Sequence, residues 1–349
     1  MSRPLSHRIH GCYSEIDLPL KLLLKRGALL AAANWQTVAI QSAAQMTFQA
    51  LLAVPIVGAA ILVAVFLGGD LANLLDGTLR EIFRTIADTL MAEPVALVAF
   101  ISSFSIVLCG GSVFLFLVKG GTVEVLAAAN AAVGPIERDA VTLDFLRPAA
   151  VFSMERFLGG CSRLFRRYLA LGVLLVVVYG ASAAAYLALI VVGYRTAEGR
   201  ESVFGWALVV ALSAVALAVW ITMVNLLYLL MQIAMAVEDV GLADAFRAVA
   251  RFVRATGREL GGVFAVVLAM VVGATLASAL AWSGVGLVAF VPLVGLAVFP
   301  LQIVALLLRG LVFEYIGLTA LGAYLTLYRR PAEQSGPAPL AWAAVRSRD

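Results

Sequence analysis

Residues of the kinds that bind metal ions or transfer protons are scarce in this 349-residue sequence. Histidine, the usual general base and zinc ligand, occurs only at His7 and His10, which form a His-x-x-His-x-Cys pattern with Cys12. These three ligands are one short of a closed zinc site, and the stretch around them has no predicted scaffold. The sequence also lacks zinc-protease, nucleophile-elbow and phosphate-loop motifs. We therefore expect no catalytic residue, no metal site and no bound cofactor.

Three glutamines, Gln41, Gln45 and Gln49, recur at intervals of four within an apolar stretch. On an α-helix this spacing places the three amides on one face. A buried amide must find a hydrogen-bond partner, so we expect this face to meet another helix or water rather than lipid. Two interpretations remain open. The amides hold neighbouring helices together, or they line a polar translocation path with Asn225 and Gln232 on its opposite wall.

Arg309 and Glu314 are the charged pair of the last apolar stretch. If the final helix starts near Leu301, Arg309 lies inside the membrane, where a lipid-facing arginine costs about 2.5–3.5 kcal/mol. A separation of five residues places the two side chains about 140° apart on a helix, so each needs its own partner. Gly310 and Gly317 share the face of Glu314 and would let another helix approach closely there. If the stretch divides into two spans, Arg309 is an ordinary boundary charge.

The overall composition indicates that lipid, not water, surrounds most of this chain. Hydrophobic residues make up 63% of the chain and charged residues 13%, and the mean hydropathy is +1.01. Soluble domains have about 45–50% apolar and about 25% charged residues. A water-soluble exterior needs more polar cover than this chain supplies. We therefore predict an all-α, polytopic transmembrane helical bundle.

Charge-free windows of about 20 residues or more mark the helices that cross the bilayer. These windows predict a six-helix transmembrane domain at 37–328, between an N-terminal segment at 1–36 and a C-terminal tail at 329–349. The six spans are expected near 37–67, 95–118, 169–193, 204–235, 260–281 and 301–328.

The apolar stretch at 285–328 has two interpretations. After a turn at 282–284 it forms either two spans, or a re-entrant segment bracketed by Pro292 and Pro300 and followed by one span. The distribution of Lys and Arg favours the second, because these residues concentrate in cytoplasmic segments. Twenty of them fall in the N-terminal segment, the loops after the second and fourth spans, and the tail, against four in the alternate loops. We expect both termini to be cytoplasmic, six spans, and residence in a bacterial inner membrane.

Three of the connecting segments also have the pattern of amphipathic helices. Leucine and isoleucine recur at helical spacing over 71–90, which predicts a helix on the outer face of the membrane. Two cytoplasmic segments, 149–169 and 242–258, carry arginines opposite apolar residues and are expected in the headgroup plane, bound to anionic lipid. The arginines expected to face lipid are Arg163, Arg166, Arg167, Arg247, Arg251, Arg254 and Arg258.

Two short motifs resemble a known group of sequences. A Gly-Gly step at Gly120 and Gly121 follows the second span, and an acidic pair at Glu238 and Asp239 opens a basic, aromatic segment through Phe246. In both respects the chain resembles uncharacterised bacterial six-helix membrane proteins, namely the DUF4013-like proteins and the membrane domain attached to some glycerophosphodiester phosphodiesterases. The resemblance covers roughly residues 95–328. It implies a six-helix architecture and transfers no catalytic residue.

The leading functional hypothesis is a non-enzymatic, structural, scaffolding or assembly component of the membrane. Its partners would be anionic lipid headgroups, with other membrane proteins or a second copy of the chain as further candidates, and no nucleic acid. The alternative is a small transporter or channel with a polar path lined by the three glutamines and by Arg309 and Glu314. A cavity that reaches the glutamines would favour the transporter, and a closely packed interior would favour the scaffold.

Overall fold

The structure is a computed structural model that describes residues 20–67, 91, 94–137, 146–197, 203–289 and 294–335. The proposed ligands His7, His10 and Cys12, the expected outer amphipathic helix at 71–90, and Pro292 lie outside these residues.

Long α-helices make up nearly all of the described chain. Six of them are long and apolar enough to cross a membrane, which confirms the predicted fold class, and each predicted span lies in a different one. A shorter helix, α1 (Leu20–Ala33), and a 3-10 helix, η2 (Arg147–Ala149), accompany them. The six long helices are α2 (Trp35–Leu67), α5 (Pro94–Ala132), α7 (Met154–Ala197), α8 (Val203–Glu238), α9 (Leu242–Ala289) and α10 (Val294–Ser335).

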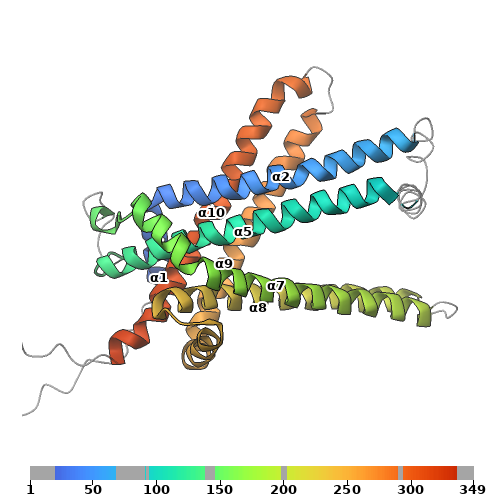
Figure 1. The fold of residues 1–349 in the computed structure, drawn as a ribbon. Coiled ribbons are helices and arrows are strands. Elements are labelled where there is room, and N and C mark those ends of the chain that lie inside the picture. Colours follow the sequence, from blue (N-terminus) through green and yellow to red (C-terminus); the bar gives the residue numbers. More distant parts are fainter. Residues whose placement is uncertain are drawn as a thin grey trace, which may run out of the picture.

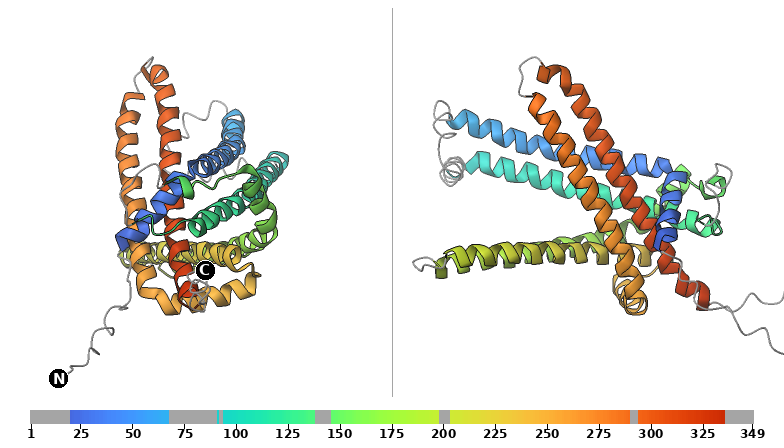
Figure 2. Two further views of the ribbon diagram at one scale, coloured as in Figure 1. Left: turned by 90° about the vertical axis from the view of Figure 1, so that its left-hand side faces the viewer. Right: turned by 180° about the vertical axis from the view of Figure 1, so that it is seen from behind.

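Consecutive long helices lie side by side as three antiparallel pairs, α2 with α5, α7 with α8, and α9 with α10 (Figure 1). The pairs meet around α1 and diverge toward their far ends, as both views in Figure 2 confirm. The buried core lies where the pairs meet and includes Leu126, Tyr168, Ile233, Val249 and Tyr324. Toward the far ends the apolar side chains are exposed, as expected for surfaces whose solvent is lipid. We call the region where the pairs meet the convergent end.

Helix α1 is an integral part of the convergent end, although the sequence analysis assigned no structure to this region. It packs across α10 where Gly27 faces Gly322. A Cβ atom added to Gly27 would lie 2.1 Å from the carbonyl oxygen of Thr319, so the two backbones are in direct contact. Small residues permit this close approach between helices in a membrane protein.

Arg26 of α1 donates five hydrogen bonds to residues at the C-terminal end of α5. Its Nη1 atom donates to Oε2 of Glu137 at 2.9 Å, and its Nε atom donates to Oδ1 of Asn130 at 2.8 Å. The other three bonds go to backbone carbonyl oxygens of Asn130, Val133 and Gly134. The C-terminal carbonyls of a helix have no partners within the helix. Arg26 therefore stabilises the end of α5 as well as neutralising Glu137.

The prediction that the second helix ends at Gly120 and Gly121 is wrong. Helix α5 continues to Ala132, and the two glycines lie where it crosses α7. A Cβ atom on Gly121 would lie 2.7 Å from the ring of Phe157, and one on Gly160 of α7 would lie 2.4 Å from Cβ of Glu124. Glycine here permits close helix packing and does not interrupt the helix.

The predicted turn at 282–284 and the re-entrant segment are also wrong. Helix α9 continues through these residues to Ala289, and α10 begins at Val294 and includes Pro300. Because 294–335 form one helix, the alternative of two spans within 285–328 is excluded as well. Glycine and proline are tolerated in membrane helices more readily than in soluble ones, so they are weak signals of a helix end there.

The two arginine-bearing segments differ in their relation to the spans that follow. Residues 154–169 are continuous with the span in α7. Residues 242–255 are separated from the rest of α9 by a kink at Thr256, where φ is −121° and ψ is 20°. Figure 2 shows this first part of α9 turned away from the long remainder of the helix. Whether either segment contacts lipid headgroups stays a prediction.

Candidate membrane-embedded polar site

A carboxylate, an ammonium group and an amide from three helices lie near one another within the bundle. Glu314 of α10 is half-buried and lies close to the side chain of Gln41 of α2. Lys119 of α5 lies near enough for its positive charge to act on Glu314, without forming an ion pair with it. We call Gln41, Lys119 and Glu314 the charged cluster. Each helix contributes one residue, so the cluster depends on how these three helices pack.

Lys119 also faces α8. Its Nζ atom lies 5.5 Å from the ring centroid of Tyr228, which is within the range of a cation–π interaction. The nearby carboxylate and the aromatic face offset part of the free-energy cost of removing the ammonium group from water. Lys119 therefore links the α10 side of the cluster to the α8 side.

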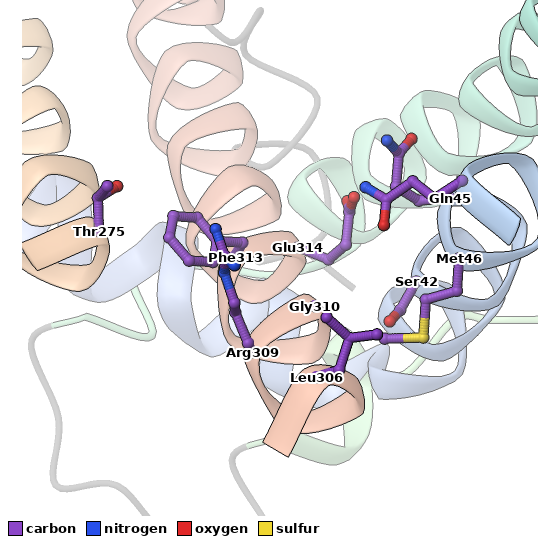
Figure 3. Close-up of a pocket in the computed structure, with 10 residues that line it drawn as sticks. Ser42, Gln45, Met46, Thr275, Leu306, Arg309, Gly310, Phe313 and Glu314 are labelled. Carbon is purple, nitrogen blue, oxygen red and sulfur yellow. The ribbon is translucent and has the colours of Figure 1, made fainter. Parts of the chain in front are cut away.

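A first cavity of about 330 Å³ adjoins the cluster between α2 and α10. Figure 3 shows Gln45 and Glu314 pointing toward each other across it. The guanidinium group of Arg309 lies over its own neighbour Phe313, with Cζ 5.7 Å from the ring centroid. The residues that line this cavity are Ser42, Gln45, Met46, Gln49, Thr275, Leu306, Arg309, Gly310, Phe313 and Glu314.

A second cavity of about 570 Å³ adjoins the cluster between α5, α8, α9 and α10. One side carries polar groups, among them Gln41, Lys119, Tyr228 and Gln232. The side formed by α9 is apolar. Gln41 and Lys119 line the second cavity and Glu314 lines the first, so the charged cluster contributes to the walls of both.

Several polar atoms around the second cavity are buried without a partner in the described chain. They are Oε1 of Gln41, the hydroxyl of Tyr228 and Nε2 of Gln232. Gln232 is 2% exposed and Tyr228 is 8% exposed. Buried polar atoms are almost always hydrogen-bonded, to water where no protein group is available. The wall of this cavity therefore contains polar atoms whose hydrogen-bonding capacity is unused within the described chain.

The structure groups the polar residues predicted from the sequence around the two cavities. Gln45 and Gln49 line the first cavity together with Arg309, and Gln232 and Asn225 line the second. Oδ1 of Asn225 accepts a hydrogen bond of 2.6 Å from the hydroxyl of Tyr179.

Arg309 and Glu314 lie on the same cavity but are not joined by an ion pair. Arg309 is exposed at the surface of α10. The aromatic ring over which it lies belongs to its own helix. Of the three glutamines of α2, Gln45 and Gln49 line the same cavity as Arg309, whereas Gln41 lines the second cavity and lies close to Glu314.

Lys119 and Tyr228 were not predicted from the sequence. Lys119 was taken as a loop charge because the charge-free stretch that predicted the second span ends at Val118. The signal available was the apolar, alanine-rich stretch from Val123 to Ala132, which continues the helical pattern beyond the glycines. A continued helix would have placed Lys119 within the protein.

A separate charged group lies at the convergent end. Asp239 follows α8 with a φ of 54°, a conformation that Asp tolerates better than most residues. Its Oδ1 accepts hydrogen bonds from Arg167 at 2.5 Å and from Arg163 at 3.3 Å. Arg163 also pairs with Glu124. The hydrogen bond and positive charge of Arg167 hold the pKa of Asp239 below its ordinary value.

Three of the seven arginines expected to face lipid, Arg163, Arg167 and Arg247, are engaged by carboxylates within the protein. Arg166 is exposed, and so are the four arginines of α9, which we call the arginine stripe. Within the stripe, Arg247 pairs with Asp244 at 2.8 Å. Opposite the stripe, Val249 and Phe252 are buried, whereas Phe246 is exposed. The members of the stripe are Arg247, Arg251, Arg254 and Arg258.

No protein-family profile matches the chain, and no curated protein or solved structure gives a significant match. The resemblance to the DUF4013-like group therefore stays a prediction.

Proposed function

We propose that this multi-pass membrane protein is a transporter for a small charged or zwitterionic solute, whose polar path passes the charged cluster. The observation that carries the proposal is that Glu314 lines one cavity and Lys119 the other, inside helices long enough to span the bilayer. Charged side chains in spanning segments cost free energy, and they typically mark the pathways of substrates and ions. Apolar residues would suffice if helix packing were their only role.

The polar walls of both cavities support this proposal over helix packing alone. Amides that only joined helices would be expected to have their hydrogen bonds satisfied by the opposing helix. Instead, Oε1 of Gln41 and Nε2 of Gln232 lack partners in the described chain. Gln45 and Gln49 also line a cavity. Capacity left open in this way is available to water or to a solute.

The experiment is to reconstitute the purified protein in liposomes and to record solute-induced currents on a solid-supported membrane. The solutes are a panel of amino acids, carboxylates, phosphates and polyamines. We expect at least one to elicit a saturable current that Glu314→Gln and Lys119→Met each reduce at least tenfold. Asp244→Asn is the matched control, since it removes an exposed carboxylate at the convergent end. Currents equal to those of empty liposomes for every solute would contradict the proposal.

A second candidate function is a structural or assembly component that binds anionic membrane surfaces. The exposed arginine stripe supports it, because it lies on the part of α9 that turns away from the span at Thr256. The charge distribution supports an inner-membrane protein with cytoplasmic termini, since the described arginine-rich segments lie at the convergent end. In this candidate function the protein has no enzymatic activity, and its partners are anionic lipids and other membrane proteins or a second copy of the chain.

A further inference from the structure

The two sides of the second cavity differ in chemistry. Helix α9 contributes only apolar residues to it, namely Phe264, Val267, Leu268 and Val271. These residues recur at intervals of three and four, so they form a continuous apolar strip along one helix face. A polar solute would leave this strip without a matching surface. The strip instead suits a hydrocarbon chain.

Among its unpaired polar atoms, the polar side of the same cavity offers more hydrogen-bond donors than acceptors. Tyr228 and Gln232 are one turn apart on α8, and the hydroxyl of the first and Nε2 of the second lack partners among the described residues. Lys119 adds an ammonium group with up to three donors and no acceptor. The unpaired acceptor among the lining amides is Oε1 of Gln41. An excess of donors around one positive charge fits a group that is rich in acceptors and negatively charged.

The cavity also reaches the outer surface of the bundle. Asn225 of α8 and Leu268 of α9 line the cavity and are exposed. Both lie within candidate membrane spans, so this part of the cavity wall is open at the depth of the bilayer. A guest held partly in the bilayer can therefore enter from the side without crossing water.

We propose that the second cavity binds a single-chain anionic amphiphile, with its carboxylate or phosphate head at Lys119, Tyr228 and Gln232 and its chain along α9. This inference rests on the proposed transport function and names the class of solute. The volume of about 570 Å³ lies within the usual range of ligand pockets, about 300–1,000 Å³. Glu314 and the anionic head attract the same ammonium group, so binding of the head replaces part of the interaction between Lys119 and Glu314.

The test uses the full-length protein in nanodiscs of phosphatidylcholine, with empty nanodiscs as the blank. The probe is 11-(dansylamino)undecanoic acid, whose fluorescence reports transfer into an apolar site, and its methyl ester is the uncharged comparison. We expect saturable binding of the acid, at least tenfold weaker binding of the ester, and at least tenfold weaker binding of the acid to Lys119→Met. Lys119→Arg should retain most of the affinity, because it keeps the charge. Lys21→Met, which removes an exposed ammonium group on α1, is the matched control and should bind as the wild type does.

Variants are compared only where they are monodisperse and have a melting temperature near that of the wild type. Tyr228→Phe, which removes one hydroxyl donor, provides a second and milder test of the donors at the head group. Equal affinity for acid and ester, or full affinity in Lys119→Met, would overturn the inference. Displacement of the probe by inorganic phosphate at equal concentration would overturn it too, since the hydrocarbon chain of the probe would then contribute nothing to its affinity.

The failure of this inference is distinguishable from failure of the transport proposal. Solute currents from the reconstituted protein without binding of the probe would refute the amphiphile and leave transport standing. Binding of the probe without a current for any solute would refute transport and leave the amphiphile site standing.

Discussion

Arg26 provides the sharpest test of how the convergent end is held together. Its side chain is 12% exposed and that of Glu137 is 3% exposed, so the ion pair is shielded from water. Substituting Arg26→Met keeps a long side chain but leaves the Glu137 carboxylate buried and unpaired. Removing one partner of a buried ion pair costs about 3–5 kcal/mol. It also removes the donors to three backbone carbonyl oxygens at the end of α5.

The assay is thermal unfolding of the detergent-solubilised protein, followed by circular dichroism. At about 2–4 °C per kcal/mol, a cost of about 3–5 kcal/mol lowers the Tm by about 6–20 °C. Adding Glu137→Gln to Arg26→Met removes the buried charge and should recover a substantial part of the loss. Lys21→Met is the matched control, because Lys21 is exposed on the same helix. A melting temperature unchanged in Arg26→Met would refute this reasoning, as would a double variant less stable than the single one.

Three further predictions concern charges elsewhere in the chain. The pKa of Asp239 is below its ordinary value, near 3.9. Its ion pairs therefore contribute stability that is fully present above that value and is lost as the pH falls through the lowered pKa. The Tm of Asp239→Asn should fall less than that of the wild type between about pH 5 and about pH 2.5, a range chosen to span the titration of this carboxyl group. Parallel plots of Tm against pH for the two proteins would refute this. Replacing all four arginines of the stripe by glutamine should weaken binding of a synthetic peptide with the sequence of residues 242–258 to anionic vesicles. The wild-type peptide should dissociate as salt rises, whereas equal binding to neutral vesicles would exclude electrostatic recognition. Arg309→Leu should leave the Tm nearly unchanged, because the exposed guanidinium group contacts a ring of its own helix; a large loss would mean that a buried partner depends on it.

Hydropathy predicted the number and approximate positions of the spanning helices, because lipid as solvent imposes long apolar stretches on the sequence. The uniformly apolar composition of these stretches also made the helix ends hard to predict. In a soluble protein, Gly120, Gly121 and Pro300 would each suggest an interruption, whereas here each lies inside a helix. The glycines are explained by close contact with α7, which is a tertiary contact that local sequence does not encode.

The candidate site was predicted in part. The interval of four between the glutamines of α2 predicted a polar face because helical periodicity is a local property, and two of them, Gln45 and Gln49, line one cavity. The identity of the partner across that face depends on how α5 and α10 are rotated against α2, which periodicity does not determine. Lys119 was therefore missed, although Glu314 was identified. Arg26 was likewise taken only as a topological charge, because its partners lie more than 100 residues away in the chain.

Water access to the two cavities is the most direct test of the proposed polar path. Single cysteines are introduced at Gln45 and Asn225, one for each cavity, after the native Cys12, Cys109 and Cys161 are replaced by serine or alanine. Val215 on α8 is the control, since its side chain is 63% exposed on the apolar surface.

The reagent is a hydrophilic maleimide applied to the protein in sealed membrane vesicles of both orientations. It reacts with the thiolate, which forms readily in water and not in hydrocarbon. We predict that Gln45→Cys and Asn225→Cys are labelled at least tenfold faster than Val215→Cys. Labelling of both as slow as that of Val215→Cys, from either side of the membrane, would contradict a water-accessible path past Lys119 and Glu314.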